Sequence, residues 1–223
     1  MKVAIIGAGP GIGLAVARRF GAEGFEVALV ARDHARLSAL SGDLAEAGIR
    51  SSAHPGDLTD EASLTHALDQ IGPVDVLVYN GGGTAGAHTP VLEVTRHSAQ
   101  DAFDGAVLGA VTAVRAVLPA MLERGSGTLL FTSGISAVHP LAFLGNIGIA
   151  VSGLRNYALS LAQALAGRGV HVGHVPIAAA VAPGSPASPE AVADTHWRLH
   201  TDRDRHEVIL GDLATVEAAI SHL

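Results

Sequence analysis

The chain has 223 residues, a net charge of -7 at pH 7 and 48% hydrophobic residues. This length suits one α/β domain with a sizeable core, and the acidic balance gives no attraction for nucleic acid or an anionic membrane surface. The absence of cysteine excludes disulfides, thiolate catalysis and cysteine-ligated zinc. No uninterrupted apolar run approaches the roughly 18 residues of a membrane span, and the apolar N-terminal stretch is too short for a signal peptide. We therefore expect a cytoplasmic protein without a membrane partner.

Strands and helices are expected to alternate along the whole chain. Asp33 and Thr59 are predicted to cap the second and third helices. Short connections between alternating elements favour a parallel sheet with right-handed crossovers, and nothing divides residues 1–223 into smaller domains. The strands are predicted at residues 2–6, 26–31, 49–54, 74–79, 128–132, 170–177 and 207–210. The helices are predicted at 12–23, from Asp33 to about 47, after Thr59, twice within 91–123, at 145–166, at 189–200 and at the end of the chain.

The loop between the first strand and the first helix is rich in glycine. A dinucleotide diphosphate must approach bare backbone at a helix N-terminus, and the turn demands unusual backbone angles, so glycine suits both needs. The general spacing G-x-G-x-x-G fails because Ile12 occupies the last position, but G-x-x-x-G-x-G fits. An ordinary tight strand-to-helix turn is the alternative. The residues predicted to hold the diphosphate are Gly7, Gly9, Pro10, Gly11 and Ile12.

The end of the second strand bears on the choice of nucleotide. An acidic residue there binds the ribose diol of NAD, whereas a basic residue accepts the extra phosphate of NADP. Arg32 follows the strand and offers a planar cation to a phosphate, which favours NADP(H) over NAD(H). A solvated surface arginine is the alternative. Asp33 could favour NAD, but helix capping also explains it.

From this loop onward the sequence resembles the short-chain dehydrogenase/reductase family over nearly its whole length. Asp57-Leu58 resembles the family's adenine-contacting pair, and Tyr79-Asn80-Gly81-Gly82 resembles its Asn-Asn-Ala-Gly segment with the first Asn replaced. The run from Gly127 to Ser133 resembles the strand that leads to its catalytic serine. The resemblance implies a Rossmann-type, doubly wound parallel sheet of seven strands in three α/β/α layers, a nicotinamide cofactor, and a homodimer or homotetramer built through two long central helices. It also implies cofactor contacts from Asp57, Leu58, Asn80, Gly81, Thr132 and Ile177.

The residues at the family's catalytic positions depart from its pattern. By position, the resemblance places the serine at Gly134, the tyrosine at Ile147 and the lysine at Val151, and the asparagine falls on Ala106. A shift of one residue would restore Ser133, but no small shift supplies Tyr-x-x-x-Lys. Ile147 and Val151 would form an apolar wall on one helix face where the acid normally sits. Because losing the acid costs about a hundred- to ten-thousand-fold in rate, an ordinary alcohol dehydrogenase mechanism is not expected.

Two residues are candidates for a replacement acid. His139 follows the fifth predicted strand, in a loop that borders the substrate in the family, and histidine donates protons readily near neutral pH. Tyr79 ends the fourth strand at the sheet edge where ligands bind. A plain structural role is the alternative for each. Ser133 does not sit in a nucleophile elbow, because Phe131 occupies the position that requires glycine, and His174 is interpreted as a satisfied core or rim residue.

The twelve histidines invite a metal interpretation. His196 and His200 are four apart on a predicted helix and could share one ion. The zinc-protease pattern requires Glu directly after the first histidine, where this chain has Trp197. We therefore expect no metal site.

The leading hypothesis is an NADP(H)-dependent oxidoreductase that acts on a small molecule without the family's Tyr–Lys acid. An imine, an iminium ion or a conjugated alkene needs less help from a protein proton donor than a simple ketone does. The alternative is a catalytically silent NADP(H)-binding protein, either a sensor or a supporting subunit, or a redox-neutral enzyme in the same pocket. A scaffold that no longer binds nucleotide is a third possibility, which the retained loop, Arg32, Asp57 and Asn80 argue against.

Overall fold

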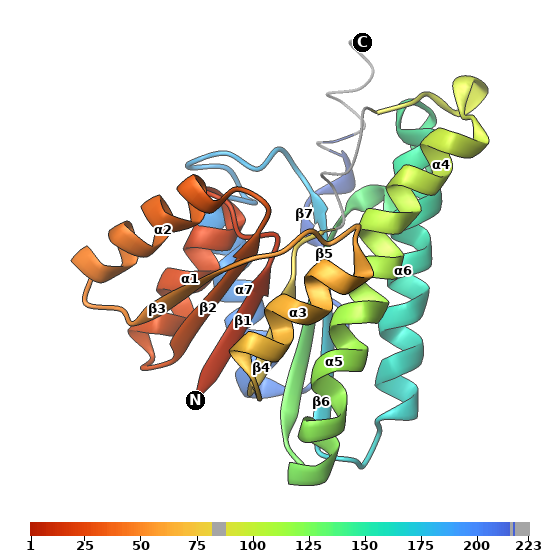
Figure 1. Ribbon diagram of the computed structural model, residues 1–223. Helices are drawn as coiled ribbons and strands as arrows, with labels where there is room; N and C mark the ends of the chain where they lie inside the picture. Colours follow the sequence, from red (N-terminus) through yellow and green to blue (C-terminus); the bar gives the residue numbers. More distant parts are fainter. Residues whose placement is uncertain (82–87, 215, 217–223) are drawn as a thin grey trace.

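In the described part of the chain, seven parallel strands form a central sheet in the order β3-β2-β1-β4-β5-β6-β7 (Figure 1). The computed structural model describes residues 1–81, 88–214 and 216. The pairing and the strand order confirm the predicted doubly wound sheet. The strands are β1 (Lys2–Ile6), β2 (Glu26–Ala31), β3 (Ser51–Pro55), β4 (Val76–Tyr79), β5 (Gly127–Gly134), β6 (Val170–Ala178) and β7 (Leu210–Gly211).

Helices cover both faces of the sheet and give the three expected layers (Figure 1). One layer holds α1 (Ile12–Ala22), α2 (His34–Glu46) and α7 (Pro189–Asp202). The other holds α3 (Glu61–Ile71), α4 (Arg96–Phe103), α5 (Gly109–Arg124) and α6 (Gly145–Ala164).

Alternate side chains of each strand enter different layers of the core. On β1, Val3 and Ile5 pack towards α1, whereas Ala4 and Ile6 pack towards α3 and α5, and all four are fully buried. A strand buried on both faces reads as a continuous apolar run, which is why the central strands were predictable.

Two capping predictions have different outcomes. Asp33 caps α2 as expected, because its Oδ1 accepts a hydrogen bond of 3.1 Å from the backbone N–H of Arg36. Thr59 does not cap α3, and this prediction was wrong. Asp57 Oδ1 accepts the backbone N–H and the hydroxyl of Thr59 at 2.9 and 2.7 Å, which holds Thr59 in a turn before the helix. Asp60 is the cap, and it accepts the N–H groups of Ala62 and Ser63.

The predicted strand at 207–210 is shorter and lies later than expected. Only Leu210 and Gly211 pair with β6, and an isolated bridge joins Glu207 to His174. The helix expected at the end of the chain falls largely on residue 215 and residues 217–223, which lie outside the described residues.

A π-helical turn at Asp104–Leu108 joins α4 to α5. A π turn leaves a backbone carbonyl without its ordinary helical partner, and the Tyr79 hydroxyl donates a hydrogen bond to the carbonyl of Gly105. Gly109 permits this approach, since a Cβ there would overlap the Tyr79 hydroxyl. The whole stretch Arg96–Arg124 is long and apolar enough to cross a membrane by length and composition alone, yet half of its most apolar window is buried inside the protein. That burial is typical of a core helix.

Candidate functional site

A cleft of about 850 Å³ opens beyond the carboxyl ends of β1 and β2. The strand order reverses here, because β2 and β4 lie on opposite sides of β1, and this is where doubly wound sheets bind ligands. The volume is in the range of small-molecule sites, about 300 to 1,000 Å³. The described lining residues are Ile6, Gly7, Ala8, Gly9, Pro10, Ala31, Arg32, Asp33, Arg36, Gly56, Asp57, Leu58, Thr59, Asp101 and Asp104.

The glycines of the first loop divide into two kinds. The fold itself requires Gly7, whose φ is +77°, and Gly13, where a Cβ would lie 2.9 Å from the Cα of Ala8. Gly9 and Gly11 are different, because a Cβ at either would meet no described protein atom within 4 Å. The start of α1 also has no side-chain cap, so its first N–H groups face the loop. Bare backbone beside open space at a helix N-terminus suits an anionic group.

Charged side chains gather where β2 ends. Arg32 and Arg36 are exposed, and both line the cleft opposite Asp57. Burial alone would raise the pKa of Asp57, but hydrogen bonds from Thr59 and the charge of Arg32 lower it below its usual value. Asp57 is therefore a carboxylate that already accepts hydrogen bonds from its own loop.

Six of the twelve residues that the sequence predicts to contact the cofactor line the cleft, and the cleft also has lining residues that were not predicted. Gly7, Gly9, Pro10, Arg32, Asp57 and Leu58 all line it. Arg36 was missed, although its position in the first turn after the second strand was a usable signal. Asp101 and Asp104 were missed because they come from the α4 region, and nothing local in the sequence places them there. Outside the described lining are Gly11, Ile12, Asn80, Gly81, Thr132 and Ile177, and Gly82 is outside the described residues.

Asn80 and Thr132 belong to a hydrogen-bonded chain at the ends of β4 and β5. The Thr132 hydroxyl donates to Asn80 Oδ1 at 2.6 Å and accepts from His196 Nε2 at 2.8 Å. Burial, followed by the proximity of His174, lowers the pKa of His196 to about 3, so this histidine is neutral. Asn80 Nδ2 and His196 Nδ1 are buried without a hydrogen-bond partner among the described residues.

The two predicted acids lie in different surroundings. Tyr79 is fully buried, and burial raises its pKa well above the usual value. A proton donor must reach its substrate, so this placement favours the structural role at the π turn described above. His139 is half-buried in the loop after β5, where its backbone N–H bonds the carbonyl of Ile135 at 2.9 Å.

The histidines considered for a metal bond to threonines of β5. His196 Nε2 bonds Thr132, as described above, and His200 Nδ1 lies 2.9 Å from the Thr128 hydroxyl. In the described part of the chain, no group of three or more His, Cys, Asp or Glu side chains is placed to hold an ion.

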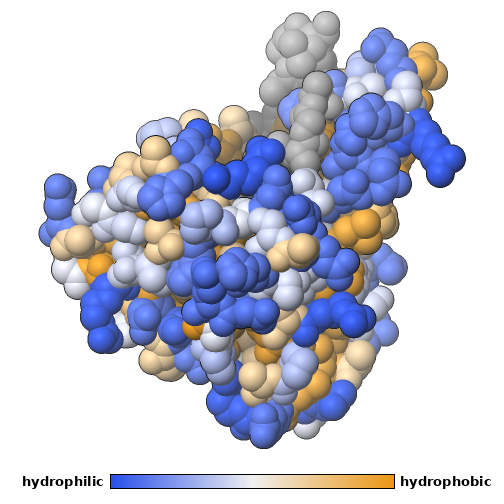
Figure 2. All heavy atoms as spheres, viewed as in Figure 1, coloured by the Kyte–Doolittle hydropathy of each residue, from blue (hydrophilic) through white to orange (hydrophobic). Residues whose placement is uncertain are grey.

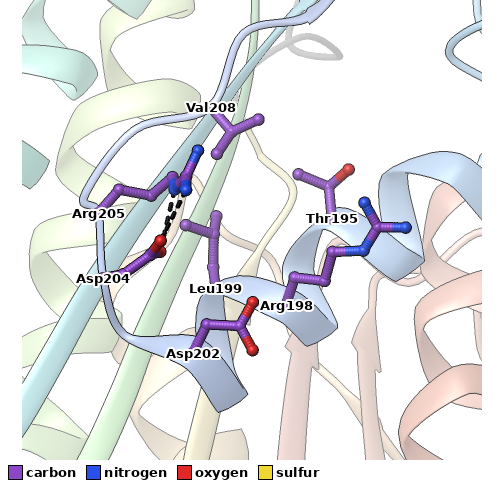
Figure 3. Close-up of a pocket in the computed structure, with 7 residues that line it drawn as sticks. All are labelled: Thr195, Arg198, Leu199, Asp202, Asp204, Arg205 and Val208. Atoms are coloured by element: carbon purple, nitrogen blue, oxygen red, sulfur yellow. Dashed lines mark hydrogen bonds and ion pairs between the residues drawn. The ribbon is translucent and has the colours of Figure 1, made fainter.

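A second, smaller hollow of about 290 Å³ lies between α7 and the segment that follows it (Figure 3). Leu199 and Val208 form its apolar part. Arg205 pairs with Asp204 beside it, with 2.6 Å between Nη2 and Oδ2 (Figure 3). None of the predicted site residues lines this hollow.

Comparison with known proteins identifies the family. A family model described as "short chain dehydrogenase" matches residues 1–193. This chain belongs to the short-chain dehydrogenase family. "Ketoacyl reductase HetN" of Nostoc sp. is 30% identical to this short-chain dehydrogenase over 178 residues, or 76% of this chain. The chain spans 60% of the length of that relative.

Solved structures of short-chain dehydrogenases share the fold of this one. The crystal structure of a short-chain dehydrogenase from Rhodopseudomonas palustris superposes with a TM-score of 0.83 at 29% identity, covering 95% of this chain and 98% of that one. A metagenomic short-chain oxidoreductase in complex with NADP superposes with a TM-score of 0.82 at 25% identity, covering 94% and 96%. This short-chain dehydrogenase thus has the fold and family of oxidoreductases.

The four positions predicted for the family's catalytic side chains lie around the ends of β5 and α6 of this short-chain dehydrogenase. Gly134 ends β5, and Ala106 lies in the π turn and is buried. Ile147 and Val151 are buried on α6, at 7% and 0% exposure. The residues at these positions offer no side-chain proton.

Proposed function

We propose that this short-chain dehydrogenase is an NADP(H)-dependent oxidoreductase, with the nucleotide bound in the cleft beside β1 and β2. The open space above Gly9 and Gly11 carries this proposal. A Cβ at either position would meet no described protein atom, whereas close approach of a diphosphate requires bare backbone there. The match of the chain to a short-chain oxidoreductase in complex with NADP supports it.

The cation pair at the end of β2 favours NADP(H) over NAD(H). Arg32 and Arg36 both line the cleft, and either could donate to a phosphate on the ribose. Asp33 is committed to capping α2, which leaves it less suited to binding a ribose diol.

Arginine variants test this preference. We expect Arg32→Ala to weaken NADPH binding about ten- to a hundredfold and to leave NADH binding nearly unchanged, because only NADPH carries the extra phosphate. Arg50→Ala removes another exposed arginine outside the cleft and is the matched control. Equal weakening of both nucleotides by Arg32→Ala would contradict NADP(H) preference.

We further infer that the family's serine, tyrosine and lysine are replaced by Gly134, Ile147 and Val151. The chain has one lysine, Lys2, which begins β1 at the opposite edge of the sheet from the cleft. Its Nζ donates to the carbonyl of Ile71 there. The side chains at these positions are apolar and buried, and they supply no proton.

The lack of a side-chain proton at these positions favours substrates that need little acid catalysis. Bound NADPH would supply a hydride, and addition to an iminium carbon gives a neutral amine without a protein proton. A conjugated alkene likewise postpones its protonation. NADPH oxidation measured against imines, enones and ketones tests the point, and fastest turnover of simple ketones would contradict it.

A catalytically silent NADP(H)-binding protein, or a redox-neutral enzyme in the same pocket, is the second candidate. It is favoured by the same observation, namely the apolar side chains of Ile147 and Val151 in α6. Micromolar NADPH affinity with no turnover across the whole panel would support it over the oxidoreductase.

A homodimer or homotetramer is part of the same proposal. The long helices α5 and α6 pack on one face of the sheet, and Leu108 and Ile149 beside them are about half exposed. Figure 2 shows apolar patches in this region of a mainly hydrophilic face. Light scattering with size-exclusion chromatography would show whether the protein is a dimer, a tetramer or, against the proposal, a monomer.

A further inference from the structure

Three side chains that the proposed oxidoreductase does not use form a continuous hydrogen-bonded line at the carboxyl ends of β5 and β6. The Ser133 hydroxyl oxygen lies 2.8 Å from His174 Nε2, and His174 Nδ1 lies 3.0 Å from Glu207 Oε2. Ser133 and His174 are buried, with 4% and 0% exposure. A buried nucleophilic hydroxyl, an imidazole and a carboxylate in this order match the roles of nucleophile, base and orienting acid.

Arg155 of α6 fixes the carboxylate end of this line. Its Nε and Nη2 donate to the two oxygens of Glu207 at 2.7 and 2.8 Å, a bidentate geometry. The hydrogen bond with His174, followed by those from Arg155, lowers the pKa of Glu207 to about 2 against the opposing effect of burial. Glu207 is therefore an ionised acceptor near neutral pH.

Backbone pairing fixes the imidazole. The N–H of His174 donates to the carbonyl of His206 at 2.9 Å, and its carbonyl accepts the N–H of Val208 at 3.0 Å. The segment that carries Glu207 thus runs beside β6, and the two side chains stay in register.

The ionised carboxylate determines which ring nitrogen carries the hydrogen. Because Glu207 only accepts, His174 Nδ1 donates to it, and Nε2 faces the Ser133 hydroxyl, which also lies 3.3 Å from the Gly134 carbonyl. A carboxylate behind the imidazole and a hydroxyl in front of it is the arrangement of a general base and its nucleophile. Such sets are recognised by geometry and not by sequence position, so the absence of a nucleophile elbow at Phe131 does not exclude one.

A second hydroxyl–histidine pair, on the other face of β5, has no counterpart of the Glu207 carboxylate among the described residues. His196 bonds the Thr132 hydroxyl at 2.8 Å, but its Nδ1 is buried without a partner among the described residues. Only the Ser133–His174 pair has a carboxylate behind the imidazole.

The residue after Ser133 is less enclosed than Ser133 itself. The next residue, Gly134, is partly exposed, and a Cβ there would meet only Ser136 Oγ, at 3.9 Å. A Cβ at Gly148 of α6 would likewise meet only Ser136 within 4 Å. The two glycines therefore leave room beside Ser136, three residues after Ser133.

We propose that Ser133, His174 and Glu207 form a second catalytic site, an acyl-transfer site for activated esters that works without the nucleotide. Ser133 Oγ bonds to the acyl carbon while its proton passes to His174 Nε2. The bond from that carbon to the leaving oxygen then breaks, and the leaving oxygen takes the electron pair and the proton. Water then attacks the acyl carbon and gives a proton to His174, which passes it to Ser133 Oγ as the Oγ–acyl bond breaks, and the carboxylic acid is released. Glu207 positions His174 throughout.

The test is covalent labelling with a fluorophosphonate probe and hydrolysis of p-nitrophenyl acetate, both without nucleotide. Intact mass and peptide mapping of the wild-type chain should show one label, on Ser133. Ser133→Ala should abolish labelling and the acetate activity. Ser136→Ala removes a buried hydroxyl three residues away that has no partner among the described side chains, and it should label normally.

Glu207→Gln separates positioning of the base from folding. It should slow labelling by about a hundredfold or more, because an amide no longer selects the Nδ1–H tautomer. Nitrogen-15 spectra of the histidines should show that tautomer in the wild type and its loss in Glu207→Gln. A folded wild type that is not labelled at Ser133, or labelling of Glu207→Gln at the wild-type rate, would overturn the proposal. Neither outcome depends on NADP(H) binding, which a nucleotide titration measures separately.

Discussion

The two halves of the sheet present different chemistry at the same edge. At β1 and β2 the cleft is lined by backbone, by Gly9 with open space above it, and by exposed arginines. At β5 and β6 the edge is filled by buried hydroxyls that bond histidines, at Ser133 and at Thr132. The cleft at β1 and β2 leaves backbone groups available to a ligand, whereas the side chains at β5 and β6 are already hydrogen-bonded to one another. The first half thus suits the proposed nucleotide, and the second half holds the hydrogen-bonded hydroxyls and histidines.

The largest expected effect is a loss of stability at acid pH, which buried histidines beside β5 and β6 should cause. His196 is buried and neutral with a pKa of about 3, and burial lowers the pKa of His171 to about 4. The unfolded chain binds protons on these histidines below pH 6.5, while the folded chain does not until pH 4 or 3. The free energy of unfolding should therefore fall as the pH drops, by about 2 kcal/mol for each histidine between pH 7 and pH 5.

Urea unfolding at the two pH values measures this fall. His196→Gln should remove about 2 kcal/mol of the pH dependence, and His34→Gln, at an exposed position, should remove none. A pH dependence unchanged in His196→Gln would show that this histidine already titrates in the folded state.

At the cleft beside β1 and β2, variants of Gly13 and Gly9 distinguish a glycine needed for folding from one needed for nucleotide binding. Gly13→Ala should cost about 1–3 kcal/mol of stability, because the new Cβ would overlap the backbone of Ala8. Gly9→Val should leave the melting temperature nearly unchanged but weaken NADPH binding at least tenfold, because its side chain enters the cleft. Thermal melting and calorimetric titration of both variants check this. Full nucleotide affinity in Gly9→Val would place the ligand elsewhere.

The sequence predicts a region well when its residues are close together in the chain, and the two regions differ in this respect. The glycine loop, Arg32 and the apolar strands are contiguous signals, so spacing located them. Ser133, His174 and Glu207 are separated by 41 and 33 residues, and they meet because β5 pairs with β6 and an isolated bridge joins His174 to Glu207. No local pattern gives that pairing, and His174 was interpreted as a satisfied residue for that reason. Thr59 was mistaken for a cap because Asp57 and Asp60 compete for the same turn.

A smaller effect concerns the carboxylate held by Arg155. Arg155→Met leaves Glu207 without its bidentate partner and should cost about 1–2 kcal/mol of stability, since both side chains are only partly buried. The folded pKa of Glu207 lies below its unfolded value, so this contribution is present above about pH 4.5 and is lost as the pH falls towards 2. Urea unfolding at pH 7 and pH 3 should show a smaller difference between variant and wild type at pH 3. A constant difference would rule out the ion pair as its cause.

The smallest expected effect distinguishes the roles of Tyr79. Tyr79→Phe removes the hydroxyl that donates to the Gly105 carbonyl and should cost about 1 kcal/mol of stability. Any NADPH-dependent turnover should be unchanged, because the side chain has no exposed surface. A loss of turnover much larger than the loss of stability would restore Tyr79 as the acid.

Nucleotide binding at the β1–β2 cleft is the claim on which the account of function depends. Isothermal titration of the wild-type protein with NADPH and with NADH tests it directly. We expect one site per chain, with micromolar affinity for NADPH and weaker affinity for NADH. No binding of either nucleotide by a protein that circular dichroism shows to be folded would contradict the account.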